Sequence, residues 1–300
     1  MRIVLRHTRL TRSQWSQQFR WYSTGADPSP IRVQSHPAPH SGSIRVLLLN
    51  RPETRNALSR RLVADLGRQV DELAAEDGRG GTRVLVIASD SDKAFCAGAD
   101  LKERKAMSLE ETQDFLHDLR QVFTNLSQLH IPTISAVSSV ALGGGLELGL
   151  CTTFRVFGST VTVGLPETRL AIIPGAGGTY RLPALIGPNR ARDLILTGRR
   201  VSGPEAYFLG LCDRLVEITP EEEKQEGTAN AKVLDVSLQL ARDICEGGPI
   251  AITQALRAVN GWQRGQANEN EAYDMILKTD DRLEAIRAFA EKRKPSFRGR

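Results

Sequence analysis

The chain has 300 residues, of which 40% are hydrophobic and 25% charged, with 40 Lys and Arg against 35 Asp and Glu. This composition is typical of a globular protein with a sizeable core, and no apolar run reaches membrane-spanning length, so we expect no membrane association. The four cysteines are far apart without CxxC spacing, and the five histidines form no HExxH pattern. Disulfide frameworks, zinc sites and metal-dependent hydrolysis are therefore poorly supported.

The first 22 residues contain five arginines and no acidic residue, with Ser, Thr and Gln between apolar positions. This pattern is typical of a mitochondrial transit peptide, so we expect cleavage after Tyr22 and a location in the mitochondrial matrix. A basic tail that binds an acidic partner is the alternative. Removal of residues 1–22 leaves 35 basic and 35 acidic residues, so the net charge gives no argument for a nucleic-acid partner.

Residues 23–43 are rich in Pro and Ser, show no hydrophobic period, and are predicted to form a flexible lead-in. Leucine and valine then recur at helical spacing, which predicts a helix over residues 59–76. Asn56 or Ser59 can cap this helix. The polar and acidic segment 217–230 is predicted to be an exposed loop, and from residue 231 the chain is predicted to be helical to its end. The other predicted strands and helices lie at 45–50 (strand), 59–76 (helix), 83–89 (strand), 109–129 (helix) and 145–151 (helix).

Three consecutive glycines, Gly143 to Gly145, separate a β-branched apolar run from a predicted helix, and Glu147 follows two residues later. Glycines at such a turn allow bare backbone N–H groups to approach a ligand at the positive end of a helix, where they can stabilise an oxyanion. Glu167 lies twenty residues further on and a second glycine-rich turn, 175–178, follows it. Two glutamates near the first turn could transfer protons. From spacing alone, tight packing and solvated glutamates remain the alternative.

Three segments resemble, in order and spacing, the signature blocks of the crotonase (enoyl-CoA hydratase) superfamily. They are CAGADLKER at 96–104, ALGGGLELGL at 141–150 and GLPETRLAIIPGAGGTYRLP at 164–183. The Arg in DLKER and the phrase ETRLAIIPG are most similar to the branch of mitochondrial methylglutaconyl-CoA hydratases, which is also described as binding AU-rich RNA. The resemblance extends from about Ile44 to the C-terminus.

The resemblance implies an α/β fold, a crotonase-type spiral of repeated ββα units over residues 44–230, followed by a C-terminal helical trimerisation region over 231–300. It also implies a homotrimer or a dimer of trimers as the assembly. The implied reaction adds water across the double bond of a 2-enoyl-CoA thioester. No metal or redox cofactor is implied, because coenzyme A is part of the acyl-CoA substrate.

The resemblance also implies roles for particular residues. Glu147 and Glu167 match the two catalytic acids, and we assign Glu147 mainly to activating water and Glu167 mainly to protonating Cα. The backbone amides of Ala99 and Gly144 match the oxyanion hole. Further positions implied to bind substrate or coenzyme A are Ala97, Asp100, Leu101, Lys102, Gly175 and Arg55. The family usually has Asp where Thr153 stands here, so local packing at that position is in question.

The branch implies 3-methylglutaconyl-CoA, an intermediate of leucine breakdown, as the substrate, and a short- or medium-chain enoyl-CoA of fatty-acid β-oxidation is the alternative. RNA binding belongs to another class of function. The helix SRRLVADLGRQV offers Arg60 and Arg68 for it, but Ala64 and Asp65 interrupt the basic stripe, so weak binding is expected. A fold kept only as an assembly scaffold is disfavoured because both glutamates are present.

Overall fold

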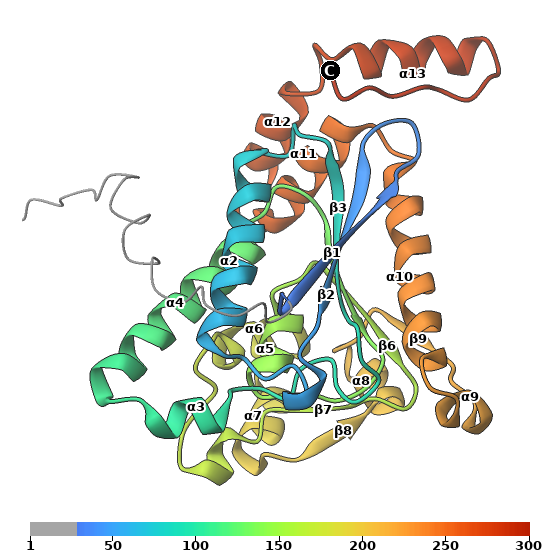
Figure 1. Ribbon diagram of the computed structural model, residues 1–300. Coiled ribbons are helices and arrows are strands. Elements are labelled where there is room, and N and C mark those ends of the chain that lie inside the picture. The colour runs from blue at the N-terminus through green and yellow to red at the C-terminus, as the bar shows by residue number, and fades with distance from the viewer. Residues whose placement is uncertain (1–28) are drawn as a thin grey trace, which may run out of the picture.

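A computed structural model describes residues 29–300 of the chain (Figure 1). In this part, the strands form a six-stranded sheet in the order β1-β2-β3-β4-β6-β9 and a three-stranded sheet in the order β5-β7-β8. The strands are β1 (Ile31–Pro37), β2 (Ser43–Leu49), β3 (Thr82–Ser89), β4 (Thr133–Val137), β5 (Ala141–Leu142), β6 (Phe154–Gly158), β7 (Thr162–Gly164), β8 (Arg200–Ser202) and β9 (Arg214–Val216).

Helices connect the parallel strands and form almost all of the C-terminal part of the chain. The α-helices are α2 (Arg60–Ala75), α3 (Leu101–Ala106), α4 (Leu109–Ser127), α5 (Gly144–Leu150), α6 (Gly178–Ile186), α7 (Pro188–Thr197), α8 (Gly203–Leu209), α9 (Pro220–Lys224), α10 (Thr228–Cys245), α11 (Pro249–Asn260), α12 (Gln266–Asp274) and α13 (Asp280–Ala290). Short 3-10 helices are η1 (Pro52–Thr54), η2 (Glu167–Leu170) and η3 (Trp262–Arg264).

The large sheet is buried on both faces, and each face has its own hydrophobic cluster. Along β2, Ile44, Val46 and Leu48 pack in the cluster that includes residues of α10, whereas Leu47 and Leu49 pack in the cluster that includes α2 and α4. Figure 1 shows α10 on one side of the sheet and α2 and α4 on the other. Because successive side chains of a strand point to opposite faces, the continuous apolar runs in β2 and β3 supply both clusters.

The predicted flexible lead-in over residues 23–43 is wrong for its described part. Ile31–Pro37 forms β1, which pairs antiparallel with β2 along its whole length, from Ile31 opposite Leu49 to Pro37 opposite Ser43. Because β1 is an edge strand, most of its side chains are exposed and can be polar, so the segment shows little hydrophobic alternation. Proline is tolerated at such an edge.

The prediction of an exposed loop over the acidic segment 217–230 is wrong in part. It contains α9, which begins after Thr219 with a capping box in which the Thr219 side chain accepts from the Glu222 N–H while Glu222 accepts from the Thr219 N–H. Pro220 occupies the first turn, where its missing N–H costs nothing. The T-P-E-E signature was therefore present in the sequence, and α10 then begins at Thr228, three residues before the predicted start of the helical end.

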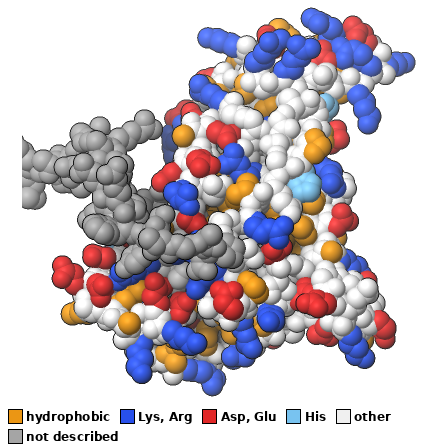
Figure 2. Space-filling view, viewed as in Figure 1, with side chains coloured by type: hydrophobic (Ala, Val, Ile, Leu, Met, Phe, Trp, Pro, Cys, Tyr) orange, Lys and Arg blue, Asp and Glu red, His pale blue; other side chains and the backbone are white. Residues whose placement is uncertain are grey.

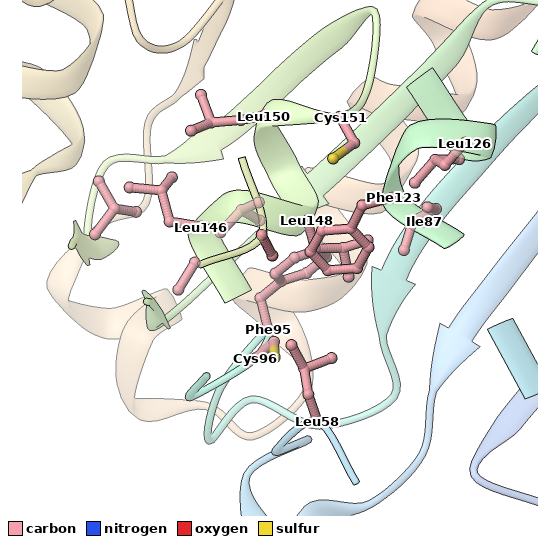
Figure 3. Packing of buried hydrophobic residues seen from close by; sticks show 14 of the residues in the cluster. Leu58, Ile87, Phe95, Cys96, Phe123, Leu126, Leu146, Leu148, Leu150 and Cys151 are labelled. Atoms are coloured by element: carbon pink, nitrogen blue, oxygen red, sulfur yellow. The ribbon is translucent and has the colours of Figure 1, made fainter. Parts of the chain in front are cut away.

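The short helix α5 packs directly on the segment that precedes α3. Phe95 and Cys96 of that segment are fully buried, as are Leu148 of α5 and Phe123 of α4. Figure 3 shows Phe95, Phe123 and Leu148 gathered beside α5, with Cys96 and Leu58 adjoining them. This packing fixes the start of α5 against residues 96–99. The start of α5 carries the predicted oxyanion amide of Gly144, and residues 96–99 carry that of Ala99.

A prediction on stability follows from Gly145. A Cβ at this position would lie 2.1 Å from the carbonyl oxygen of Cys96, so Gly145→Ala should clash with backbone that cannot move aside. The helical preference of alanine gains at most about 1 kcal/mol, whereas overpacking of a core costs about 1–3 kcal/mol or more. We expect a net loss of unfolding free energy in urea titrations.

Gly81→Ala is the matched control, because no heavy atom lies within 4 Å of a Cβ built there. Equal stability of the Gly145→Ala protein and the wild type would contradict the close contact between α5 and residue 96.

Candidate active site

The predicted oxyanion amide of Ala99 belongs to an extended segment held between two neighbours. Leu58 forms a parallel bridge with Ala99, and Cys96 forms one with Ala141. The N–H of Leu58 donates to the Gly98 carbonyl at 2.8 Å, and the N–H of Asp100 donates to the Leu58 carbonyl at 3.2 Å. In this parallel bridge the residues on either side of Ala99 make the hydrogen bonds to Leu58, and Ala99 itself makes none. The Ala99 N–H therefore points away from Leu58, toward the side of β5 and α5.

The predicted second donor, Gly144, is the first residue of α5, so its N–H has no acceptor within the helix. A Cβ at Gly98 would lie 3.6 Å from the Gly144 nitrogen and 2.8 Å from the Leu142 carbonyl oxygen, and Gly98 has φ of 98°. Glycine is therefore required there for both reasons. Within residues 29–300, neither amide donates a backbone hydrogen bond in a turn, loop or cap, which leaves both available to a ligand atom.

Glu147 lies on α5, one helical turn after the glycines, with 3% of its surface exposed. Its Oε1 accepts the N–H groups of Ala176 and Gly178, each at 2.8 Å. Burial raises the pKa of this carboxyl, while the two backbone donors oppose that shift because they bind the ionised form. The second glycine-rich turn thus holds Glu147 in place and reduces the upward shift of its pKa.

Glu167 is the first residue of η2 and is also buried. Its Oε2 is enclosed and has no hydrogen-bond partner in the described part of the chain. Burial raises the pKa of Glu167 to about 7, and the nearby charge of Glu147 adds to the effect. The two glutamates therefore differ in hydrogen bonding. Glu147 accepts two backbone N–H groups, whereas Oε2 of Glu167 accepts none.

Both carboxyl groups face the first glycine turn. A Cβ at Gly143 would lie 3.1 Å from Glu167 Oε1, and a Cβ at Gly144 would lie 4.0 Å from Glu147 Oε2. The structure thus brings together, at one turn, the two glutamates and the Gly144 amide that the sequence predicted. A reacting atom beside this turn would meet two proton-transfer groups and backbone donors.

Two arginines that the sequence analysis did not single out brace the second glycine turn. Arg120 of α4 donates from Nε to the Gly175 carbonyl at 2.7 Å, and Arg181 of α6 donates from Nη1 to the Ala176 carbonyl at 2.9 Å. The charges of both guanidinium groups lower the pKa of Glu147, against the larger effect of burial. The contact of Arg120 spans 55 residues, so no local pattern marks it.

Asn56 is a further residue whose position the sequence analysis did not predict. Ser59, not Asn56, caps α2, where its side chain accepts the Leu62 N–H at 3.2 Å. Asn56 is fully buried and donates to Ser89 Oγ at 2.9 Å and to the carbonyls of Ala94 and Phe95 at 3.1 Å. It therefore fixes the chain just before the segment that carries the Ala99 amide.

The residues predicted to bind coenzyme A lie around the same segment. The N–H of Ala97 donates to the Arg55 carbonyl at 3.0 Å, and the Arg55 side chain is exposed. Asp100 is buried and caps α3, where it accepts the Glu103 N–H at 3.3 Å. The two positions that follow it in the first turn of α3 are exposed; they are Leu101 and Lys102.

Thr153, which stands where the family usually has Asp, is hydrogen-bonded to Thr133. Its Oγ1 accepts the Thr133 N–H at 3.1 Å, and its own N–H donates to Thr133 Oγ1 at 2.9 Å. These reciprocal bonds join β4 to the start of β6. A threonine is therefore accommodated at this position by a second threonine opposite it.

The basic side chains considered for RNA binding on α2 are paired with acids. Arg60 lies 3.3 Å from Glu111, and Arg68 pairs with Asp65 one turn before it. On the face seen in Figure 2, acidic and basic side chains are interspersed. This distribution agrees with the prediction of weak RNA binding, which stays a prediction.

Within residues 29–300, no group of three or more His, Cys, Asp and Glu side chains could hold a metal ion. No helix in that part of the chain is long and apolar enough to cross a membrane.

The chain belongs to the enoyl-CoA hydratase/isomerase family, whose model matches residues 40–300. It is 58% identical over 294 residues to an enoyl-CoA isomerase/hydratase of Zymoseptoria tritici, covering 97% of this chain and 96% of the relative. It is 52% identical to the mitochondrial methylglutaconyl-CoA hydratase 1 of Pyricularia oryzae, over 94% of this chain and 90% of that protein.

The fold matches the crystal structure of an enoyl-CoA hydratase from Bacillus anthracis with a TM-score of 0.81 and 38% identity, covering 90% of this chain and all of that one. These findings confirm the predicted superfamily, the crotonase-type fold and the predicted class of reaction. The chain is an enzyme of the hydro-lyase class, a hydratase that acts on enoyl-CoA.

A prediction on pH follows from Glu167. In the folded protein its pKa is raised from 4.5 to about 7, so between these values the native state holds a proton that the unfolded chain releases. Stability due to this group is therefore present at low pH and is lost as pH rises toward about 7. Relative to wild type, Glu167→Gln should gain unfolding free energy between about pH 5 and about pH 8.

Urea unfolding at about pH 5 and at about pH 8 measures the difference in unfolding free energy between Glu167→Gln and wild type. Glu223→Gln is the control, because Glu223 is exposed, and we expect its difference from wild type to change little with pH. A Glu167→Gln difference that does not vary with pH would contradict the raised pKa.

Proposed function

We propose that the enzyme hydrates 3-methylglutaconyl-CoA, with Glu147 and Glu167 as its proton-transfer groups and the amides of Ala99 and Gly144 as its oxyanion hole. The observation that carries this proposal is the pair of buried glutamates with contrasting hydrogen bonding at one glycine turn. The name of the Pyricularia oryzae relative, a methylglutaconyl-CoA hydratase, supports this choice of acyl group.

The thioester carbonyl of the substrate would lie between the two free amides. As water attacks Cβ, negative charge develops on the carbonyl oxygen, and two fixed N–H groups stabilise that charge without reorganising. The removal of one such donor in other enzymes typically costs about 100- to 1,000-fold in rate. Gly144→Pro removes the second N–H at this site, so we expect it to lower the rate by a comparable factor.

Glu147 would accept the proton of the attacking water, because the two backbone N–H groups on its Oε1 bind the ionised form and oppose the rise in its pKa that burial causes. Glu167 would deliver a proton to Cα, because its unpartnered Oε2 and its pKa of about 7 favour the neutral acid near neutral pH. Addition of water across a double bond requires one group that accepts a proton and one that donates a proton, and the two glutamates would take these roles.

We place the enzyme in the mitochondrial matrix, as a homotrimer or a dimer of trimers that binds acyl-CoA. The Pyricularia oryzae and human methylglutaconyl-CoA hydratases that resemble it are named mitochondrial. The predicted transit peptide, residues 1–22, lies outside the described residues, so matrix targeting and cleavage after Tyr22 stay predictions.

Steady-state kinetics on Glu147→Gln and Glu167→Gln test the mechanism. Glutamine keeps the volume and the hydrogen-bonding shape but cannot transfer a proton, so each variant should lose about 100- to 10,000-fold in kcat. Both should still bind the CoA thioester, and the double variant should be little worse than either single one because the proton path is shared. Near-normal hydration by either single variant would refute the two-glutamate mechanism.

The acyl group is tested by hydration of 3-methylglutaconyl-CoA and crotonyl-CoA by the purified wild type, followed through loss of the enoyl absorbance. We expect a higher kcat/KM on 3-methylglutaconyl-CoA. A higher value on crotonyl-CoA would favour the alternative, a short-chain enoyl-CoA hydratase. Because the Zymoseptoria tritici relative is named an isomerase/hydratase, a 3-enoyl-CoA belongs in the same assay as a test for double-bond migration.

A further inference from the structure

Arg120 has an unusual position for a surface arginine. It lies one helical turn after Leu116 on α4, and both residues face Gly175: a Cβ there would lie 3.6 Å from Leu116 Cδ2 and 4.0 Å from Arg120 Nη2. The Nε of Arg120 donates to the Gly175 carbonyl at 2.7 Å. This bond fixes the guanidinium beside the turn whose amides hold Glu147.

The rest of the Arg120 guanidinium is not paired with an acid. Among residues 29–300 it forms no ion pair, and its side chain is exposed. Arg181, the other arginine at this turn, is occupied by three acceptors, which are the carbonyls of Ala176 and Phe123 and the hydroxyl of Ser127. Arg120 is therefore the cation at this turn with N–H groups left for a ligand.

The Glu147 carboxyl connects the Gly144 turn with the second glycine turn, which Arg120 contacts. Glu147 spans the gap, because its Oε2 faces Gly144 whereas its Oε1 is bound by Ala176 and Gly178. An acyl group whose carbonyl lies at Gly144 and whose Cβ lies beside Glu147 therefore continues toward the second turn and Arg120. In a 3-methylglutaconyl group, the free carboxylate is two bonds beyond Cβ.

A substrate carboxylate at this place would otherwise be unfavourable, because it would come close to the buried carboxyl group of Glu147. A guanidinium offsets that repulsion and can bind both carboxylate oxygens at once. Arg120 already acts electrostatically in the site, since its charge lowers the pKa of Glu147 against the larger effect of burial.

We propose that Arg120 binds a carboxylate at the far end of the acyl group, and so selects dicarboxylic acid monothioesters over neutral enoyl-CoA substrates. This proposal rests on the proposed function and adds the residue that would determine its specificity. It concerns Arg120 as a substrate-binding group with no part in proton transfer.

Arg120→Gln tests the proposal, because glutamine can still donate to the Gly175 carbonyl but carries no charge. The measured quantity is the ratio of kcat/KM for glutaconyl-CoA to that for crotonyl-CoA, two substrates that differ only in the carboxylate. Loss of one charge-assisted contact should lower this ratio by about 10- to 100-fold. Arg120→Lys, which keeps the charge but loses the planar fork, should lower it less.

A binding measurement without chemistry completes the test. Glutaryl-CoA and butyryl-CoA lack the double bond, so their dissociation constants report recognition alone, and Arg120→Gln should weaken only glutaryl-CoA by about 10-fold or more. Arg190→Gln is the matched control, because Arg190 is also exposed and holds a backbone carbonyl, that of Leu209 at 3.2 Å. Its ratios should equal those of wild type.

An unchanged ratio in Arg120→Gln, or an equal loss on both substrates, would overturn the proposal and leave Arg120 as a support of the Gly175 turn. These outcomes differ from failure of the proposed function. If wild type itself shows no preference for the carboxylate substrate, the proposed acyl group is wrong and the proposal for Arg120 falls with it.

Discussion

The two hydrogen bonds from Ala176 and Gly178 to one oxygen of Glu147 are the interaction on which the site depends. They join α5 to a turn that follows it by about thirty residues, so the first and second glycine turns take fixed positions relative to each other. A buried carboxylate without such partners would be expelled or protonated. With them, Glu147 is a structural link between the two turns, and the rise in its pKa that burial causes is opposed.

The same constraint explains why glycines dominate both turns. The site is assembled by close backbone approach: α5 lies against residue 96 at Gly145, and Gly98 lies against Leu142 and Gly144. Donors placed in this way belong to the backbone, so they are as rigid as the fold that holds them. Preorganised backbone donors of this kind are worth most where water is excluded, because no reorganisation is needed when charge develops.

Sequence reasoning identified the glycine turns and both glutamates because strand, glycine run and helix are contiguous there. It missed β1, whose edge position permits polar side chains, and α9, although the capping box at Thr219 could have been recognised. The contacts of Arg120 with Gly175 and of Asn56 with residues 94–95 could not be predicted in this way, since they depend on tertiary packing. Local patterns therefore predicted the two glutamates proposed to transfer protons, while the contacts that position the surrounding turns required the fold.

The central claim is that burial beside a second glutamate raises the pKa of Glu167 to about 7. Carbon NMR of protein labelled at the glutamate carboxyl carbons measures this directly through a pH titration. One carboxyl should titrate near pH 7, where burial places Glu167, and this signal should be absent in Glu167→Gln. In Glu147→Gln the same signal should titrate at lower pH, because the neighbouring charge is gone. A titration in which every glutamate carboxyl ionises in the usual range for exposed groups, near about pH 4, would contradict the account.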